Sequence, residues 1–239
     1  MIPLLIGRRP QGSVSLSSNS STIATAPYGL RTERGAAIDL ASTAGTEFTF
    51  ACWINRSTLP ASKYVLARME TTDASSYVEI SIASRKRISV TVVEEGLPTA
   101  VFYSSTDSVP SDGFWHHVCV TIDTNTTQEE RRAIVAVDSY ERAMFATNPM
   151  SYGAVVSSIE NNRRAYVLGT ETESMQFPGA AAHAYLVFGR ALDAGYFTRQ
   201  PGASLLPRDF PAAVGASDIY LPLTASFTDA WNSNAFSEV

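Results

Sequence analysis

Short runs in which apolar and polar residues alternate, each closed by a turn, recur along residues 29–200. In "EFTFACWIN" (residues 47–55), one face carries Phe48, Phe50, Cys52 and Ile54, and the other carries Thr49, Ala51 and Trp53. Because successive side chains of a strand point to opposite faces of a sheet, this period of two predicts a β-strand. The same pattern predicts strands in "SYVEISIAS", "RISVTVVEE", "WHHVCVTID", "RAIVAVDSY", "AYVLGTE" and "AAAHAYLVFGRAL".

Many short strands, separated by Gly, Pro, Asp or Asn and without a long segment of period 3.6, favour an all-β fold of two antiparallel sheets. One helical turn is predicted in "LDAGYFTRQ" (residues 192–200), and Gly195 weakens it. Only 17% of the 239 residues are charged, and the excess of Ser, Thr and Ala suits sheets and solvated turns. We therefore predict one antiparallel two-sheet sandwich over residues 28–239.

Residues 1–27 differ from the rest of the chain. They hold a short apolar run, two arginines and a Ser-rich stretch that ends at Pro27, so we expect an extended arm outside the core. The arm residues expected to bind a partner are Ile2, Leu4, Leu5, Ile6, Arg8 and Arg9. The alternative is an arm that folds back over its own sheet. The apolar run is too short for a signal peptide and its positive charges follow it, which favours synthesis in the cytoplasm.

Five sequence motifs follow one another in a recognisable order. They are Phe48-Thr49 with Trp53, Trp115-His116-His117-Val118-Cys119-Val120-Thr121, the run from Val135 to Ser139, Val167-Leu168-Gly169, and the stretch from Gly179 to Leu192. Over residues 29–200 the chain thereby resembles the laminin G-like and pentraxin-like domains of the concanavalin A-like lectin/glucanase superfamily. The resemblance implies a jelly-roll sandwich that binds sugars or proteins through its rim loops.

The three histidines, His116, His117 and His183, raise the question of a metal site. His116 and His117 are neighbours in a predicted strand, so they point to opposite faces and cannot bind one ion together. A structural zinc site typically needs four ligands of this kind, and we predict no metal on these residues. We expect instead that Trp115 fills the sandwich and that the histidine rings pack with their nitrogens hydrogen-bonded.

The two cysteines lie in two of the matched strands. The resemblance to pentraxins implies a disulfide between these strands, but Cys52 falls one residue later than its counterpart. An offset of one residue turns a side chain to the other face of the sheet. Without a secretory signal, we expect Cys52 and Cys119 to be free thiols in the core.

The sequence does not contain the residues of a known catalytic set. Glucanases of the superfamily use paired carboxylates on one strand, spaced as in "ExDxxE". Glu79 has no acidic partner two or four residues on, and the adjacent Glu94 and Glu95 would diverge in a strand. No Ser-His-Asp signature or Gly-rich phosphate loop is present. We therefore expect a protein that is not an enzyme and that uses no cofactor.

Binding of sugar or calcium stays open. The fold often holds calcium through loop carboxylates, but the acidic position of the family's closing strand is Ala184 in this chain. Acids that could belong to such a site are Asp73, Asp107, Asp112 and Asp138. Aspartates in loops and at strand ends are also ordinary turn formers. Aromatic residues that could stack on sugar rings are Tyr103, Tyr140 and Tyr152.

The functional expectation combines these features. A net charge of −5 argues against nucleic acid or an anionic membrane as a partner, and no stretch reaches the ~20 apolar residues of a membrane span. Proteins similar to this one, with a short apolar arm, are familiar among tailed-phage virion components. We expect a non-enzymatic virion protein, either a capsid decoration or a tail or fibre component. Its partners would be capsid or tail subunits, further copies of itself, or a glycan. The alternative is a soluble lectin-like carbohydrate-binding module.

The C-terminal segment "DIYLPLTASFTDAWNSNAF" (residues 218–236) resembles the strand that normally opens a laminin G-like domain, yet in this chain it comes last. First and last strands of these jelly rolls lie side by side. Residues 218–239 could therefore fill that place by local permutation, with Tyr220, Leu221 and Leu223 packed and Pro222 at an edge or bulge. The alternative is an extra edge strand or a loose tail.

Overall fold

The computed structural model describes residues 30–33, 45–56, 63–71, 73–105, 107–160, 164–169, 177, 179–200, 204–208, 218–221 and 237–238. The arm of residues 1–27, with all six of its proposed partner-binding residues, lies outside the described residues. Every strand pairing that the structure describes is antiparallel.

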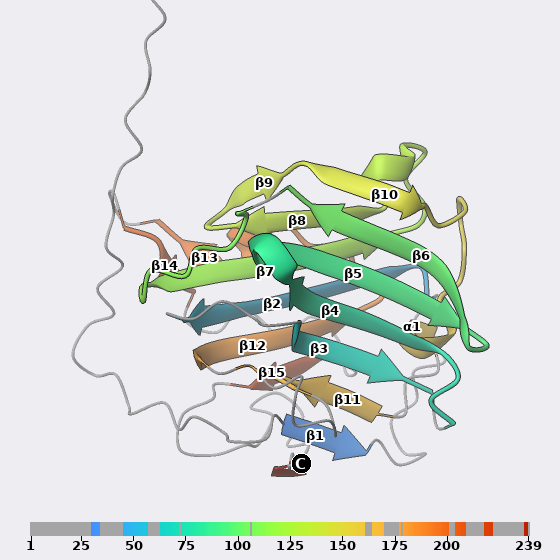
Figure 1. The fold of residues 1–239 in the computed structure, drawn as a ribbon, viewed down its shortest axis with the longest axis horizontal. Coiled ribbons are helices and arrows are strands. Elements are labelled where there is room, and N and C mark those ends of the chain that lie inside the picture. The colour runs from blue at the N-terminus through green and yellow to red at the C-terminus, as the bar shows by residue number, and fades with distance from the viewer. Residues whose placement is uncertain are drawn as a thin grey trace, which may run out of the picture.

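Two large sheets lie face to face as the layers of a sandwich (Figure 1). The eight-stranded sheet has the order β10 (Met144–Asn148), β6 (Leu97–Ser104), β5 (Arg87–Glu94), β4 (Tyr77–Ala83), β3 (Tyr64–Glu70), β11 (Arg164–Val167), β1 (Leu30–Glu33) and β16 (Ser237–Glu238). The six-stranded sheet has the order β15 (Ile219–Leu221), β12 (Ala180–Phe188), β2 (Glu47–Asn55), β7 (Trp115–Asp123), β8 (Ala133–Val137) and β9 (Tyr140–Arg142). The predicted all-β jelly-roll sandwich is confirmed.

The remaining elements are short. Strands β13 (Thr198–Arg199) and β14 (Leu206–Pro207) pair with each other. The helical turns are η1 (Ser84–Lys86), η2 (Glu129–Arg131), α1 (Ser157–Glu160) and η4 (Ala194–Tyr196). The turn η4 lies inside the segment for which the sequence predicted a helical turn, whereas the single turn α1 was not predicted.

The main core lies between the two sheets. From β2 it takes the predicted set Phe48, Phe50, Cys52 and Ile54, all fully buried. The facing sheet contributes the alternate residues of β4 and β5, namely Val78, Ile80, Ile82, Ile88, Val90 and Val92. Period-two alternation therefore identified the inward side of these strands correctly.

The outer face of the six-stranded sheet is also partly covered. Residues 190–200, here called the strap, place Ala194 and Phe197 against Ala51, Cys119 and Tyr185, among others, in a second buried cluster. Backbone groups of the strap bond to the sheet: Thr49 Oγ1 donates to the Arg190 carbonyl (2.9 Å), and Thr121 Oγ1 donates to the Leu192 carbonyl (2.7 Å). Because both faces are covered, seven consecutive residues of β2 are buried.

Two tryptophans differ from expectation. Trp115 was predicted to fill the sandwich, but it is only half-buried at the start of β7. Trp53 is fully buried instead, on the outer face of β2, where its ring lies 5.3 Å from the ring of its cross-strand partner His117. A tryptophan on the outer face of a sheet is buried only where another segment of the chain packs over it. The alternation of apolar and polar residues within a strand does not show which segments do so.

The C-terminal segment supplies β15, which pairs with β12 at the edge of the six-stranded sheet. Tyr220 is buried there, its ring stacks on that of Tyr185 at 4.6 Å, and its hydroxyl and His183 Nδ1 are 2.7 Å apart. Residues Pro222 and Leu223 lie outside the described residues. The local permutation of residues 218–239 stays a prediction.

Tyr220→Ala should lower the free energy of unfolding by about 3 kcal/mol, because it removes a buried aromatic side chain and leaves a cavity beside Tyr185. Tyr220→Phe keeps the ring and loses the hydroxyl contact with His183, so its cost should be about 1 kcal/mol. Urea unfolding followed by tryptophan fluorescence measures both values. If both variants unfold within about 0.5 kcal/mol of the natural chain, β15 does not contribute to the stability of the sandwich.

Candidate functional site

The face of the eight-stranded sheet that points away from the six-stranded sheet is here called the polar face. On β4, Val78, Ile80 and Ile82 enter the core, so Tyr77, Glu79 and Ser81 point outward. Because register fixes which residues stand opposite each other, the pairing of six strands, β11, β3, β4, β5, β6 and β10, brings their outward residues into rows.

Two such rows cross the polar face. The first consists of cross-strand partners in series: Tyr166, Arg68, Glu79, Thr91 and Val101. The second lies two residues along the strands and consists of Ser81, Ser89, Tyr103 and Phe145. Two residues of a strand span about 7 Å, so the rows adjoin. Arg68 on β3 is three strands from Tyr103 on β6, about 14 Å across the sheet, so a ligand that contacts both needs the length of an oligosaccharide.

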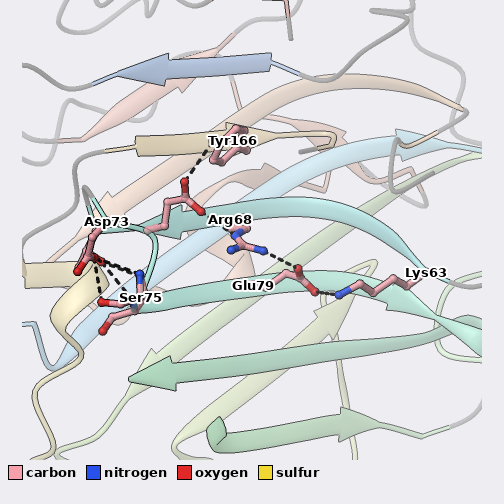
Figure 2. Close-up of polar contacts among 9 residues, drawn as sticks. Lys63, Arg68, Asp73, Ser75, Glu79 and Tyr166 are labelled. Atoms are coloured by element: carbon pink, nitrogen blue, oxygen red, sulfur yellow. Dashed lines mark hydrogen bonds and ion pairs between the residues drawn. The ribbon is translucent and has the colours of Figure 1, made fainter. Parts of the chain in front are cut away.

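Charged side chains form a continuous network in and beside the first row (Figure 2). Lys63 Nζ donates to Glu79 Oε1 (2.7 Å), and Arg68 Nη1 lies 3.6 Å from Glu79 Oε2. Arg68 Nε also donates to Glu70 Oε2 (3.0 Å), and the Tyr166 hydroxyl donates to Glu70 Oε1 (3.1 Å). Arg68 therefore stands between two carboxylates that come from different strands.

The network joins buried acids to accessible cations. The Glu79 side chain is 2% exposed, whereas those of Arg68 and Lys63 are 20% and 38% exposed. The guanidinium carbon of Arg68 lies 3.8 Å from the centre of the Tyr77 ring, a cation–π contact that orients the planar group. The sequence around Glu79 does not reveal these partners, because β3 residues lie opposite Glu79 only through strand register.

The second row ends in a pair of aromatic side chains. Tyr103 on β6 and Phe145 on β10 are direct cross-strand partners, and Phe145 is 59% exposed. Of the three tyrosines considered for sugar stacking, Tyr103 alone belongs to the polar face. Tyr140 lies on β9 of the other sheet and Tyr152 in a loop, and both are exposed. Phe145 was not among the sequence candidates.

Two of the loop acids are accounted for by local structure. Asp73 Oδ1 accepts hydrogen bonds from Thr71 Oγ1 (2.7 Å), from Ser75 Oγ (2.9 Å) and from the Ser75 backbone N–H (3.1 Å), as Figure 2 shows in part. These hydrogen bonds lower the pKa of Asp73 to about 2. Asp107 is largely exposed and lies 3.6 Å from Lys86. Both therefore behave as turn or surface acids.

The other two acids hold His116 between them. His116 Nδ1 is 2.7 Å from Asp138 Oδ2, and His116 Nε2 is 3.0 Å from Asp112 Oδ1. Asp138 and Ser139 both have positive φ and form the two-residue turn between β8 and β9, which is the turn role considered for Asp138. Burial lowers the pKa of His116, but hydrogen bonds and charges from Asp138 and then Asp112 outweigh it and raise the pKa overall.

His117 points to the opposite side of β7 from its neighbour. It is fully buried, its ring lies 6.4 Å from that of Phe197, and neither ring nitrogen has a hydrogen-bond partner among the described residues. The expectation of hydrogen-bonded nitrogens was therefore wrong for His117, although it holds for His116. Burial, slightly opposed by the charge of Asp138, lowers the pKa of His117 to about 4, so the ring is neutral at pH 7.

The predicted free thiols are confirmed: Cys52 and Cys119 are both buried and unbonded. Cys52 lies in the core between the sheets, and Cys119 lies under the strap on the outer face. Burial raises the pKa of both thiols, that of Cys119 to about 12, so neither is an activated nucleophile.

In the part of the chain that the structure describes, no cluster of three or more His, Cys, Asp or Glu residues could hold a metal ion. None of the described helices is long and apolar enough to span a membrane.

Comparisons with known proteins support the resemblance for part of the chain. A family model described as "Concanavalin A-like lectin/glucanases superfamily" matches residues 31–134. Comparison with curated protein sequences gives no match.

Several solved structures are similar. The NanB sialidase of Streptococcus pneumoniae is 14% identical, with a TM-score of 0.49; the match covers 70% of this chain and 26% of the sialidase. The chain thus spans about a quarter of the sialidase's length. A SAP-like pentraxin of Limulus polyphemus is 14% identical over 75% of this chain and 76% of the pentraxin, with a TM-score of 0.47. Domains LG4-5 of the mouse laminin α1 chain are 13% identical over 94% of this chain and 53% of theirs, with a TM-score of 0.46.

The two adjacent histidines should make opposite contributions to the dependence of stability on pH. The unfolded chain binds a proton at His117 near pH 6.5 and the folded chain only near pH 4, so the natural protein should lose stability as the pH falls between these values. By pH 4.5 the loss from this residue amounts to about 2.5 kcal/mol. The raised pKa of His116 has the reverse effect, a stabilisation that is complete below pH 6.5 and disappears at higher pH.

Urea unfolding at pH 8 and pH 4.5 checks this assignment. His117→Leu should lose less stability on acidification than the natural protein, and His116→Gln should lose more. Parallel losses in all three proteins would show that other groups dominate the acid response.

Proposed function

We propose that this chain is a non-enzymatic carbohydrate-binding module that holds its ligand on the polar face. The observation that carries the proposal is the meeting of two kinds of group on one sheet surface. Tyr103 and Phe145 supply aromatic rings. Arg68 and Thr91 in the neighbouring row, and Lys63 beside it, supply hydrogen-bonding groups. The match of residues 31–134 to a superfamily named for lectins and glucanases supports a sugar as the ligand.

A sugar has an apolar face and polar hydroxyl groups, which match the aromatic and the hydrogen-bonding residues of the polar face. The C–H face of a pyranose is apolar and gains by packing on an aromatic ring, and 59% of Phe145 is exposed for such a contact. The hydroxyl groups of further sugar units along an oligosaccharide need donors and acceptors, and Arg68 lies about four strand spacings from Phe145, about 19 Å. Arg68 has donor N–H groups in a plane fixed by Tyr77 and Glu70, so little conformational entropy is lost on binding.

The same network argues against hydrolysis. A glycosidase needs one carboxylic acid that can give a proton to the leaving group and one carboxylate nearby. The two acids on this face, Glu70 and Glu79, both have cationic partners in Arg68 or Lys63. The side chains of Glu70 and Glu79 are only 5% and 2% exposed, so neither carboxyl group is open to the oxygen of a bound glycosidic linkage. We therefore propose that the polar face binds without cleaving.

Binding should depend on the aromatic pair. With the glycan that binds best on an array, Phe145→Ala should weaken the affinity at least tenfold, about 1.4 kcal/mol, because the stacked face is lost. Tyr103→Ala should have an effect of the same order. Isothermal titration calorimetry of the full chain gives the dissociation constants.

Tyr140→Ala is the matched control, since Tyr140 is 64% exposed but lies on the other sheet. Its affinity should equal that of the natural chain. The proposal is wrong if no glycan binds, or if Tyr140→Ala weakens binding as much as Phe145→Ala does.

We also propose a setting for this module, the surface of a tailed-phage virion, as a capsid decoration or a tail or fibre component. The support comes from the sequence of the arm, where an apolar run precedes Arg8 and Arg9, a pattern suited to docking on a larger assembly. The polar face would then meet glycans of the host cell.

Immunogold labelling of intact purified particles tests this setting, with an antibody raised against residues 45–200. Gold should decorate the capsid or the tail of the particle. If the protein is found only in the soluble lysate and the particles stay unlabelled, the module acts outside the virion.

A further inference from the structure

Arg87 is the first residue of β5, which lies between β4 and β6 in the eight-stranded sheet (Figure 1). Its neighbour Ile88 enters the core, so Arg87 points to the polar face, as Ser89 does. The residue opposite it on β4 is Ala83, whose side chain has no polar group. Arg87 is half-buried in this position.

The guanidinium group of Arg87 has no hydrogen-bond or ion-pair partner in the part of the chain that the structure describes. Each of the other arginines whose side chains are described has at least one polar or ring contact. Of the three nitrogens of Arg87, only Nε is both buried and unpartnered, so the two terminal nitrogens are open to solvent. An arginine keeps its charge at every physiological pH, and its N–H donors need acceptors. The fold itself supplies none here.

Arg87 stands beside the aromatic pair of the polar face. Ser89 lies directly opposite Tyr103, so Arg87, two residues earlier, is the diagonal neighbour of Tyr103. Positions related in this way are about 7–8 Å apart, a distance that long side chains can bridge. Arg68 is three strands from Tyr103 and is already held by carboxylates. Arg87 is therefore the cation that a sugar stacked on Tyr103 would meet.

The positive charge of Arg87 is not balanced by its surroundings. The network of Figure 2 contains two carboxylates and two cations, which neutralise each other. Lys86, in the preceding turn, lies 3.6 Å from Asp107. The net charge of −5 belongs to the whole chain, and charges further away than about 8 Å are largely screened at physiological ionic strength.

We propose that Arg87 binds a carboxylate or sulfate group on the sugar unit that stacks on Tyr103 and Phe145, so that the polar face takes acidic oligosaccharides. A guanidinium group can donate two parallel hydrogen bonds to such an anion. An uncharged sugar in the same place would displace water from Arg87 without offering it a counter-charge, which disfavours uncharged ligands. This inference rests on the proposed sugar site and names the class of sugar that the site selects.

A glycan array tests the class of ligand. It carries uronate, sialylated and sulfated oligosaccharides, each beside its uncharged counterpart, the methyl ester or the desulfated form. The full chain should bind at least one acidic oligosaccharide at least tenfold more tightly than its counterpart. The chemical identity of that oligosaccharide distinguishes a carboxylate from a sulfate as the group that Arg87 binds.

Two replacements of Arg87 test the residue, by isothermal titration calorimetry with that acidic oligosaccharide and its uncharged counterpart. Arg87→Gln should weaken binding of the acidic form at least tenfold and leave the uncharged form within about twofold. Arg87→Lys keeps the charge but not the planar fork, so its affinity for the acidic form should lie between the two. Because Arg87 has no partner within the described fold, urea unfolding of both variants should match that of the natural chain.

Arg131→Gln is the matched control, because it removes the same charge on the other sheet. Arg131 lines a cavity of about 580 Å³ on the outer face of the six-stranded sheet, beside the strap. The other charged residues of that cavity are Asp123, Glu141 and Asp193, so its rim is acidic and does not suit an anion. Binding of the acidic oligosaccharide by Arg131→Gln should equal that by the natural chain.

The outcomes separate this inference from the proposed function. Loss of the preference in Arg87→Gln, but not in Arg131→Gln, supports the inference. If acidic and uncharged forms bind equally and Phe145→Ala weakens both, Arg87 does not select the ligand, and the sugar site itself stands. A preference for acids that survives in Arg87→Gln places the anion elsewhere and also overturns the inference. If no oligosaccharide binds, the proposed function is wrong and this inference with it.

Discussion

The pairing of β2 with β7 is the constraint on which the rest of the molecule depends. The nine residues of β2 stand opposite the nine of β7, from Glu47 opposite Asp123 to Asn55 opposite Trp115, in the middle of the six-stranded sheet. Both faces of this ribbon are buried, one against the other sheet and one against the strap and its neighbours. Its outward hydroxyls, those of Thr49 and Thr121, therefore take backbone partners in the strap.

This arrangement gives the molecule two unlike surfaces. The outer side of the six-stranded sheet is partly closed by the strap, and what remains open is a cavity with an acidic rim. The outer side of the eight-stranded sheet has cross-strand rows of polar and aromatic side chains that build the polar face. The two surfaces belong to different sheets and face opposite sides of the sandwich, so a molecule bound at one would not block the other.

Much of the fold could be predicted from alternation alone, because β2, β4, β5 and β7 each show a period of two and the inward set of β2 was correct. The side of Cys52 also followed, since one residue of offset decides the face. The polar face could not be found in this way. Arg68 and Glu70 share one face of β3 by alternation, but they meet Glu79 only through the register of β3 with β4, which no local pattern contains. Phe145 was missed for the same reason, as its partner Tyr103 lies on another strand.

The sequence pattern also did not show which outward side chains are buried by segments far away along the chain. The burial of His117 involves the strap, more than 70 residues further along, because the Phe197 ring lies 6.4 Å from the His117 ring. Trp53 packs on His117 on the outer face of the sheet, whereas Trp115, expected to fill the sandwich, is only half-buried. The motif glycine Gly179 also has its cause on a distant strand, because a Cβ at this position would lie 2.2 Å from the Asn55 carbonyl oxygen of β2. Its conservative replacement by alanine is therefore sterically excluded by the neighbouring backbone.

The two buried thiols lie on opposite faces of one sheet. Each therefore reports a different way in which buried parts of the protein become exposed to solvent. Cys119 is reached when the strap lifts from β7, and Cys52 is reached only when the two sheets part. The kinetics with which an alkylating reagent modifies each sulfur atom therefore distinguish a local fluctuation of the strap from separation of the whole sandwich. The modification rate of Cys119 thus reports opening of the strap, and that of Cys52 reports opening of the core, although both residues lie on adjacent strands of one sheet.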